Sequence, residues 1–273
     1  MPEQYSLEDL LYLMSRLRDP DGGCPWDLKQ DFLSITGSTV EEAYELVDAI
    51  RHNDRDHIEE ELGDVLFQTI FYSQLAREND WFDFHQVVDG LTRKLIRRHP
   101  HVFPDGDLQA RFDGDIDVEQ VRRQWDDIKL AERAEKSQHG LLDDIPDALP
   151  ALIRAQKMQK RLSSVGFDWD SPLAAISKLK EELAELEEAI TNQDAANIEE
   201  EMGDLLFCCV NISRHLKVDA EKALGMTNHK CEQRFQFVEN NLQSQGKTPE
   251  DATLMEMDDL WEQSKLQGKL GPQ

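Results

Sequence analysis

The sequence contains His57-Ile-Glu-Glu-Glu-Leu-Gly-Asp-Val-Leu-Phe67 and, 140 residues later, Asn197-Ile-Glu-Glu-Glu-Met-Gly-Asp-Leu-Leu-Phe207, with identical residues at eight of the eleven positions. The residues before this segment repeat at the same offset, because Glu41-Glu42 and Glu45-Leu46 align with Glu181-Glu182 and Glu185-Leu186. An offset that recurs over two segments indicates a duplicated structural unit. We therefore predict two domains of common ancestry.

The similarity extends toward the carboxyl end of each repeat. After a four-residue deletion the offset shortens to 136, and it aligns a basic pair and a Trp–Lys pair, namely Lys94, Arg98, Trp125 and Lys129 with Lys230, Arg234, Trp261 and Lys265. A stretch punctuated by Pro146 and Pro150 separates the repeats. We predict an N-terminal domain at residues 1–135, a linker at 136–150 and a C-terminal domain at 151–273.

Composition and residue spacing both predict helices. The chain has 14 Gly and 10 Pro, or 24 chain-breaking residues in 273, which is below the usual share. In the second repeat apolar residues recur three or four positions apart in two runs: Ile176, Leu179, Leu183, Leu186 and Ile190, then Ile198, Met202, Leu205, Cys209 and Ile212. Such stripes are typical of amphipathic helices. We predict an all-α fold with two main helices, a basic helix and a Trp-bearing helix in each repeat.

The charge and the cysteines exclude several classes of protein. With 30 basic and 56 acidic residues the net charge is −26, which argues against binding to duplex nucleic acid or to an anionic membrane, since both are polyanions. The chain has no uninterrupted apolar run of 18 residues and no signal-peptide pattern at its N-terminus. Its four cysteines form no Cys-x-x-Cys pair, so we expect reduced thiols in a cytoplasmic protein.

Four acids in each repeat are expected to converge. In the second repeat each of these acids precedes a stripe residue by one position, so that all of them flank the same side of their helices. They are Glu182, Glu185, Glu201 and Asp204, and the first repeat copies them as Glu42, Glu45, Glu61 and Asp64. When two such helices pack in antiparallel fashion, these flanks face each other across the interface. A glycine precedes the aspartate in both repeats, at Gly63 and Gly203, and we expect a close approach there because glycine disfavours helix interiors.

Converging carboxylates need a counter-charge. Most Glu-x-x-Glu pairs are simply solvated helix faces. Two like charges about 5 Å apart, however, repel by about 3 kcal/mol at an effective dielectric of 20, so four of them require protons or a divalent cation. Ligands that are all oxygen favour Mg²⁺, with Mn²⁺ as a substitute, and such a Mg²⁺ normally meets substrate phosphates. A di-iron bundle would require Glu-x-x-His pairs, which these positions lack.

Basic and aromatic residues accompany the acids of the second repeat. Lys178 lies four positions before Glu182, on the same helical face, and the candidates farther along the chain are Lys230, Arg234, Trp261 and Lys265. A lone lysine usually forms only a surface ion pair, but most of these residues recur in the first repeat. Lys178 is the exception, because it aligns with Ser38, and the nearby Lys180 likewise aligns with Val40. The second repeat therefore carries basic residues that the first one lacks.

Several motifs together resemble the bacterial MazG family. The first repeat carries Gly23-Cys-Pro-Trp-Asp27, Glu41-Glu-Ala-Tyr-Glu45, Glu59-Glu-Glu-Leu-Gly-Asp64 and Arg97-Arg-His-Pro-His-Val-Phe103. The second repeat carries Val165-Gly-Phe-Asp-Trp169, the acidic block Glu181–Glu185 and Glu199-Glu-Glu-Met-Gly-Asp204. The resemblance covers nearly the whole chain. It implies two MazG-like helical domains, each with a four-helix-bundle-type core that dimerisation completes.

The resemblance also implies an activity and the residues that carry it. Members of the family hydrolyse nucleoside triphosphates, of the ribo and deoxyribo series, to nucleoside monophosphate and pyrophosphate with Mg²⁺. Residue by residue, the metal ligands would be Glu182, Glu185, Glu201 and Asp204, with Glu42, Glu45, Glu61 and Asp64 as a second set. The nucleotide site would contain Lys178, Glu181, Lys230, Arg234, Trp261 and Lys265, and the catalytic residues would be Lys178, Glu181 and Glu182.

The family pattern leaves some points open. Family members can have a lysine where this chain has Asn197, and the sequence does not choose between Glu181 and Glu182 as the general base. We expect the C-terminal domain to carry the activity and the N-terminal one to be weak or regulatory. The alternatives are a pyrophosphohydrolase specific for dUTP or phosphoribosyl-ATP, a non-catalytic helical binding module, and a metal-storage bundle.

Overall fold

The computed structural model describes residues 4–111, 117–119, 121, 124, 125, 128, 132 and 140–267. Among these residues there are helices and turns but no strand, which confirms the all-α prediction. The chain separates into two compact units, Met1–Leu130 (unit 1) and Ala131–Gln273 (unit 2). The linker predicted at 136–150 begins outside the described residues, and its described part, from Gly140 to Pro150, consists of turns and bends.

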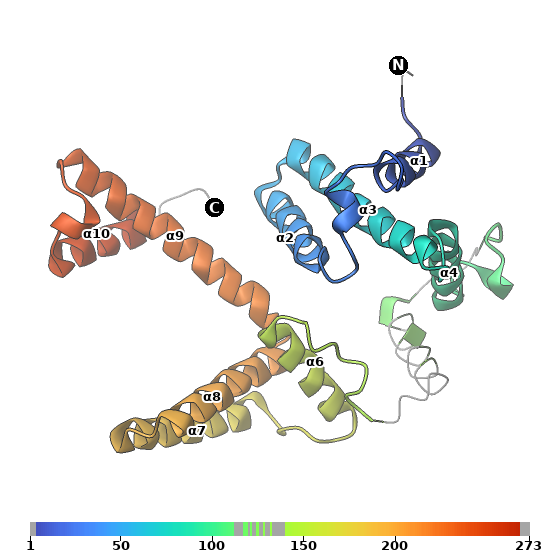
Figure 1. The fold of residues 1–273 in the computed structure, drawn as a ribbon. Helices are drawn as coiled ribbons and strands as arrows, with labels where there is room; N and C mark the ends of the chain where they lie inside the picture. Colours follow the sequence, from blue (N-terminus) through green and yellow to red (C-terminus); the bar gives the residue numbers. More distant parts are fainter. Residues whose placement is uncertain are drawn as a thin grey trace. The chain divides into compact units, whose positions relative to one another are not determined.

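Unit 1 is organised around an antiparallel pair of helices, α2 and α3 (Figure 1). Its helices are α1 (Leu7–Leu17), α2 (Thr36–His52), α3 (Arg55–Glu78) and α4 (Phe84–Arg98), with short 3-10 helices η1 (Asp27–Lys29) and η2 (Pro104–Gly106). A core of Met14, Ile35, Ile70, Phe71 and Leu75 joins α1 and the start of α2 to the second half of α3. Arg18 holds the η1 loop, because its guanidinium donates to Gln30 O at 3.1 Å and pairs with Glu78 at 2.6 Å.

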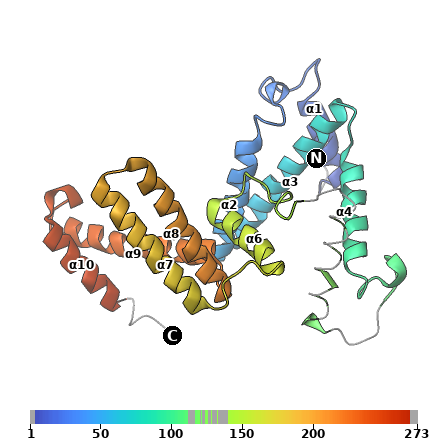
Figure 2. The same ribbon diagram turned by 90° about the horizontal axis from the view of Figure 1, so that it is seen from below.

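Unit 2 repeats this pair as α7 and α8, which lie side by side in two views (Figure 1, Figure 2). Its helices are α6 (Ala151–Ser164), α7 (Pro172–Asn192), α8 (Ala195–His215), α9 (Ala220–Ser244) and α10 (Leu254–Gln267), with the 3-10 helix η3 (Pro249–Asp251) before α10. On one side α6 packs on α8, where the Gln159 amide donates to Phe207 O at 2.8 Å. A separate small core of Val238, Leu242 and Leu260 fixes α10 against the later part of α9.

A short turn of the same design reverses the chain inside each hairpin. Asn53 and Gln193 end α2 and α7 in the left-handed region, with φ of 53° and 55°. The next residue, Asp54 or Asp194, caps the following helix by accepting a hydrogen bond from the backbone N–H three positions on. A left-handed residue is a common helix end and Asp is a favoured N-cap. The turn therefore fixes the register in which the two acidic helix faces meet.

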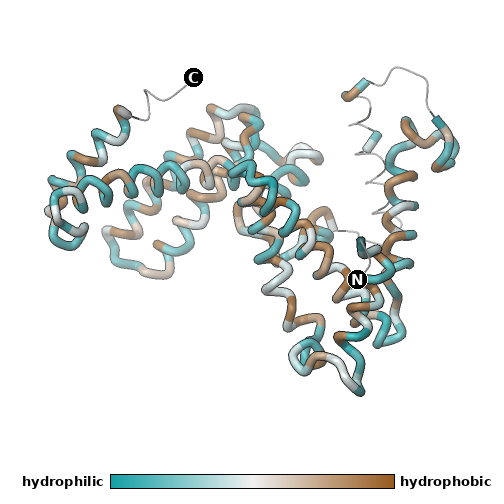
Figure 3. Tube along the Cα trace, turned by 90° about the horizontal axis from the view of Figure 1, so that it is seen from above, coloured by the Kyte–Doolittle hydropathy of each residue, from teal (hydrophilic) through white to brown (hydrophobic). Residues whose placement is uncertain are grey.

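The predicted apolar stripe of α7 coincides only in part with the face that is buried, since Leu186 is buried but Leu183 and Ile190 are exposed. In the structure the buried residues of α7 are Ala175, Glu182, Leu186 and Ala189. Leu183 and Ile190 are 46% and 55% exposed, and Met202 of α8 is 43% exposed. Glu182 thus lies in the seam between the helices, not at its edge. Figure 3 shows hydrophobic and hydrophilic residues interspersed along the helices.

The expected close approach at the two helical glycines is wrong for the single chain. A Cβ atom added at Gly63 or Gly203 would meet no atom within 4 Å, so both positions face open space. A glycine in a helix costs about 1 kcal/mol relative to alanine, and no contact within the described residues offsets this cost. Over the same described part of the chain, no helix combines the length and the apolar character needed to cross a bilayer.

The core of unit 1 yields a stability prediction. Phe71 is 1% exposed and packs edge-on against Phe67 with ring centroids 5.8 Å apart. Because truncating a buried aromatic side chain leaves a cavity, we expect Phe71→Ala to lower the free energy of unfolding by about 3–5 kcal/mol. Urea denaturation followed by circular dichroism measures this loss. Leu33→Ala, at an 81% exposed position of the same unit, is the control and should be near neutral; an equal loss in both variants would contradict the assigned core.

Candidate functional site

In unit 2 the α7–α8 hairpin brings three of the four predicted metal ligands together. Carboxylate oxygens of Glu182, Glu201 and Asp204 lie within 4.8 Å of one another. Glu182 is 5% exposed, Glu201 is half-buried and Asp204 is exposed, so the cluster opens to solvent on one side. The fourth acid, Glu185, lies one turn beyond Glu182, and burial followed by a hydrogen bond to the Glu182 carboxyl group raises the pKa of Glu185.

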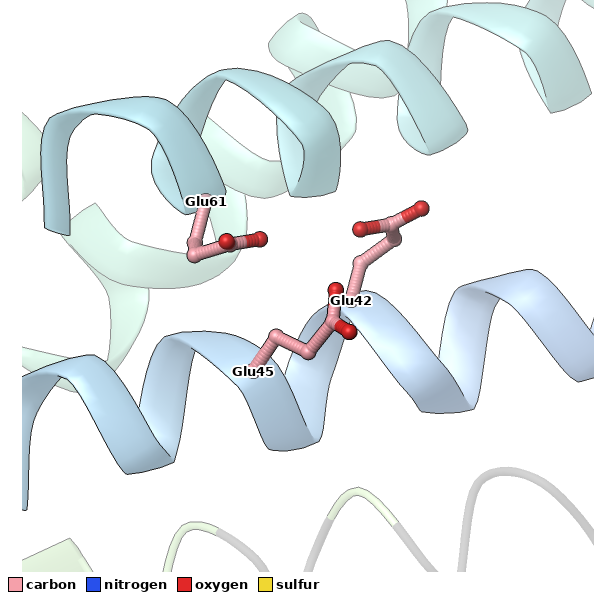
Figure 4. Close-up of side chains that lie close together, drawn as sticks. All are labelled: Glu42, Glu45 and Glu61. Atoms are coloured by element: carbon pink, nitrogen blue, oxygen red, sulfur yellow. The ribbon is translucent and has the colours of Figure 1, made fainter. Parts of the chain in front are cut away.

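Unit 1 forms the corresponding cluster in its own hairpin. Glu42 and Glu45 on α2 and Glu61 on α3 have carboxylate oxygens within 4.8 Å of one another. Figure 4 shows the Glu61 side chain extending from α3 toward the two glutamates of α2. The negative charge of Asp64 contributes to a raised pKa of Glu42, so this acid also lies near the cluster. We refer to the four acids of each unit as its quartet.

The two quartets are electrostatically strained. Burial and then the charges of neighbouring acids raise the pKa of Glu42 and of Glu61. In unit 2 burial is again the first cause that raises the pKa of Glu185 and of Glu201, followed by their contacts with Glu182. Like charges at this spacing disfavour the ionised state. Each quartet therefore favours the uptake of protons or of a cation.

The donor atoms fit a hard divalent cation. All eight residues offer carboxylate oxygens, the ligand type that Mg²⁺ and Mn²⁺ prefer. In unit 1 one oxygen of Glu61, Oε2, is shielded from solvent and has no hydrogen-bond partner among the described residues. A shielded carboxylate oxygen without a partner is costly, so it is an available ligand.

Lys178 is the predicted basic residue that the structure places in the quartet of unit 2. Its Nζ lies 2.8 Å from Glu182 Oε1 and 2.7 Å from Glu181 Oε1. The hydrogen bonds to Glu181 and then to Glu182 raise the lysine pKa well above its ordinary value. The predicted catalytic residues Lys178, Glu181 and Glu182 therefore lie together.

The other predicted nucleotide-binding residues lie on α9 and α10. The guanidinium of Arg234 lies over the Trp261 ring, 5.7 Å from its centroid. Lys265 pairs with Glu262 on its own helix, and Lys230 is exposed beside Met226 and Gln233 in a shallow hollow of α9. Figure 1 draws α10 along the far part of α9, apart from the α7–α8 hairpin. The structure thus brings Arg234 and Trp261 together without packing α10 on the hairpin. Lys129, which corresponds to Lys265, lies outside the described residues.

The sequence did not predict that Cys208 lies next to the quartet of unit 2. Cys208 is 5% exposed on α8, one turn after Asp204. Burial and then the negative charge of Glu182 raise the pKa of its thiol, which stays protonated. Its position four residues after an acid of the quartet was the available signal.

Comparisons with known proteins identify the class to which this fold and this acidic hairpin belong. Residues 30–103 and 170–238 both match the family model of the MazG nucleotide pyrophosphohydrolase domain. Both matches include a complete quartet. The chain belongs to the MazG family, and both of its repeats are MazG domains.

Individual relatives are similar over almost the whole chain. The chain is 46% identical over 265 residues to the nucleoside triphosphate pyrophosphohydrolase of Escherichia coli K12, a match that covers 96% of this chain and 97% of that protein. It is 41% identical over 258 residues to the nucleoside triphosphate pyrophosphohydrolase/pyrophosphatase MazG of Thermotoga maritima, covering 94% and 95% of the two chains. A third relative, the uncharacterized protein YabN of Bacillus subtilis, is 40% identical over 254 residues, which span 93% of this chain and half of that protein.

The raised carboxyl pKa values give a pH-dependent stability prediction. Because the folded protein holds its Glu42 proton more tightly than the unfolded chain does, stability falls as the pH rises from the ordinary value of 4.5 through the raised pKa. Glu42→Gln removes this loss. We expect the variant, in EDTA, to melt a few degrees above the parent protein at pH 8 and together with it near pH 4.

Scanning calorimetry across this pH range measures the effect. Glu59→Gln is the matched control, since Glu59 is an exposed acid of α3 outside the cluster. A gain from Glu42→Gln that does not depend on pH, or an equal gain from Glu59→Gln, would contradict the assigned repulsion.

Proposed function

We propose that this protein hydrolyses ribo- and deoxyribonucleoside triphosphates to nucleoside monophosphate and pyrophosphate, with Mg²⁺ as cofactor and the quartet of unit 2 as the catalytic centre. The observation that carries the proposal is the convergence of Glu182, Glu201 and Asp204 within 4.8 Å, with Lys178 bound to one of them. The names of the relatives from Escherichia coli and Thermotoga maritima support the substrate class.

The chain supplies charge for the phosphates. Mg²⁺ held by Glu182, Glu185, Glu201 and Asp204 would neutralise phosphate oxygens and favour attack at phosphorus. Lys178, Lys230 and Arg234 offer cationic groups that stabilise negative charge on the triphosphate and on the leaving pyrophosphate. Trp261, whose ring is covered on one side by Arg234, offers an aromatic surface on which a base can stack.

The geometry favours Glu181 over Glu182 as the general base. Glu182 is buried in the seam and contributes its oxygen to the cluster, so its lone pairs are engaged. The side chain of Glu181 is 59% exposed, neighbours the cluster and has Lys178 as its partner. We propose that Glu181 accepts the proton of the attacking water once Lys178 has turned to the phosphates.

We propose a weaker or regulatory role for unit 1. It has the full quartet, but Ser38 and Val40 stand where unit 2 has Lys178 and Lys180. A triphosphate bound at this quartet would therefore meet fewer cationic groups. We also propose a cytoplasmic location, which the four free cysteines support.

We further propose a homodimer in which the α9–α10 arm of one protomer completes the catalytic site of its partner. The α7–α8 hairpin has exposed apolar residues on both helices, namely Leu183, Ile190, Met202 and Leu206, which are 43–55% exposed. Exposed apolar patches are typical of surfaces that bind a partner. The arm carries Arg234 and Trp261, and it extends away from the hairpin of its own chain (Figure 1).

Product analysis tests the proposed reaction and its location. The protein is incubated with Mg²⁺ and, in separate reactions, with each ribo- and deoxyribonucleoside triphosphate, including dUTP, and with phosphoribosyl-ATP. The products are separated by ion exchange. We expect monophosphate and pyrophosphate, and at least a 100-fold loss of kcat in Glu185→Ala, because a lost ligand disrupts the cation site. Glu45→Ala in unit 1 is the matched control, with a much smaller loss. Equal losses of kcat in Glu185→Ala and Glu45→Ala would contradict the proposed difference between the two units. Release of nucleoside diphosphate and orthophosphate would contradict cleavage to monophosphate and pyrophosphate. Absence of turnover would favour a non-catalytic binding module.

Complementation between inactive variants tests the shared site. Glu185→Ala removes a ligand of the hairpin, and Arg234→Ala removes a cation of the arm. If the arm acts on its partner, mixed dimers contain one site with both residues intact. We expect co-refolded mixtures to recover roughly a quarter of the parent activity, as random pairing predicts. Sedimentation of the parent protein as a monomer, or a mixture no more active than its components, would contradict the proposal.

A further inference from the structure

The ammonium group of Lys178 contacts one of the carboxylates that would bind the cation in unit 2. It is 2.8 Å from Glu182 Oε1, and Glu182 supplies one of the three converging ligand oxygens of unit 2. The Glu182 side chain is 7% exposed and that of Lys178 is 31% exposed, so this ion pair is poorly screened by solvent. A second contact, 2.7 Å from Glu181 Oε1, holds the lysine in place.

A divalent cation and this lysine would both act on the Glu182 carboxylate. Mg²⁺ binds carboxylate oxygens at about 2.0–2.1 Å, and the ammonium group would remain within a few ångströms of it. Two positive charges at that spacing repel each other. Binding of the cation therefore favours withdrawal of Lys178, and the withdrawal breaks its ion pairs with Glu181 and Glu182.

Unit 1 has the same acids without the competitor. Ser38 occupies the position of Lys178, and no ion pair among the described residues involves Glu42, Glu45 or Glu61. Glu61 Oε2 is shielded and has no hydrogen-bond partner within the described chain. The charge of His57 acts on Glu61, but His57 is bound to Asp54 at 2.9 Å and its side chain is 65% exposed, so a carboxylate already offsets its charge.

We infer that Lys178 is an internal counter-ion that lowers the affinity of the unit 2 quartet for free divalent cations, so that this quartet is loaded together with the nucleotide, whereas the unit 1 quartet binds the free cation. The inference rests on the proposed function, since it assumes that phosphates receive the displaced lysine. Lys178 then has two successive partners, the quartet before binding and the triphosphate afterwards. Glu181 becomes free in the same step, which couples cation loading to the release of the proposed base.

The repeat provides the experiment with matched variants. Binding of Mn²⁺ alone is measured by the electron paramagnetic resonance signal of the free ion. Glu45→Gln/Glu61→Gln leaves only the unit 2 quartet, and Glu185→Gln/Glu201→Gln leaves only that of unit 1. On the first background we expect Lys178→Ser to tighten Mn²⁺ binding by about tenfold and Lys178→Arg to leave it unchanged. On the second background we expect Ser38→Lys to weaken it by a similar factor.

A second arm adds the nucleotide. By linkage, an α,β-methylene triphosphate analogue that draws Lys178 away must raise the affinity of unit 2 for Mn²⁺, and Lys178→Ser must reduce this enhancement. The analogue should change Mn²⁺ binding by unit 1 much less. Melting curves establish that each variant is folded.

The outcomes separate this inference from the proposed function. Unchanged or weaker Mn²⁺ binding in Lys178→Ser, with both quartets competent to bind, overturns the counter-ion role and leaves the proposed function intact. An enhancement by the analogue that is equal in Lys178→Ser and its parent overturns the coupling to nucleotide. Failure of both quartets to bind Mn²⁺ overturns the metal assignment and with it the inference.

Discussion

The repulsion among four carboxylates held in one helical hairpin is the constraint on which the structure of each unit depends. The capped turn at Asn53-Asp54 or Gln193-Asp194 fixes the register that brings the acids together. Burial of Glu182 and shielding of Glu61 then remove part of the water that would screen their charges. The packing that stabilises the hairpin therefore creates a charge that something else must neutralise.

The two units meet this constraint in different ways. Unit 2 supplies a counter-charge from its own helix, because Lys178 is one turn before Glu182. Unit 1 has a serine at that position, and no ion pair among the described residues involves Glu42, Glu45 or Glu61. Both repeats thus contain the same four acids, whereas Ser38 and Val40 stand in unit 1 where unit 2 has Lys178 and Lys180.

Local pattern was sufficient to predict the helices, the repeat and the convergence of the acids, because the hairpin involves residues close in sequence. The same pattern did not predict which residue of α7 is buried between the helices. Leu183 belongs to the apolar stripe but is exposed, whereas the neighbouring Glu182 is buried in the seam. A stripe with a 3.6-residue period does not reveal which of two adjacent positions faces a neighbour when both faces carry apolar residues. The packing of α10 against α9 was likewise not predictable, since it depends on contacts made after the η3 turn.

The quartet of unit 2 lies between residues 182 and 204, and that of unit 1 between residues 42 and 64. Contacts between residues so near in sequence close small loops, which cost little chain entropy and form early in folding. Each site can therefore assemble as soon as its own hairpin has left the ribosome, before the rest of the chain has been synthesised. Nascent chains would then carry a concentrated negative charge at an early stage, and the ions of the surrounding solution would take part in folding itself.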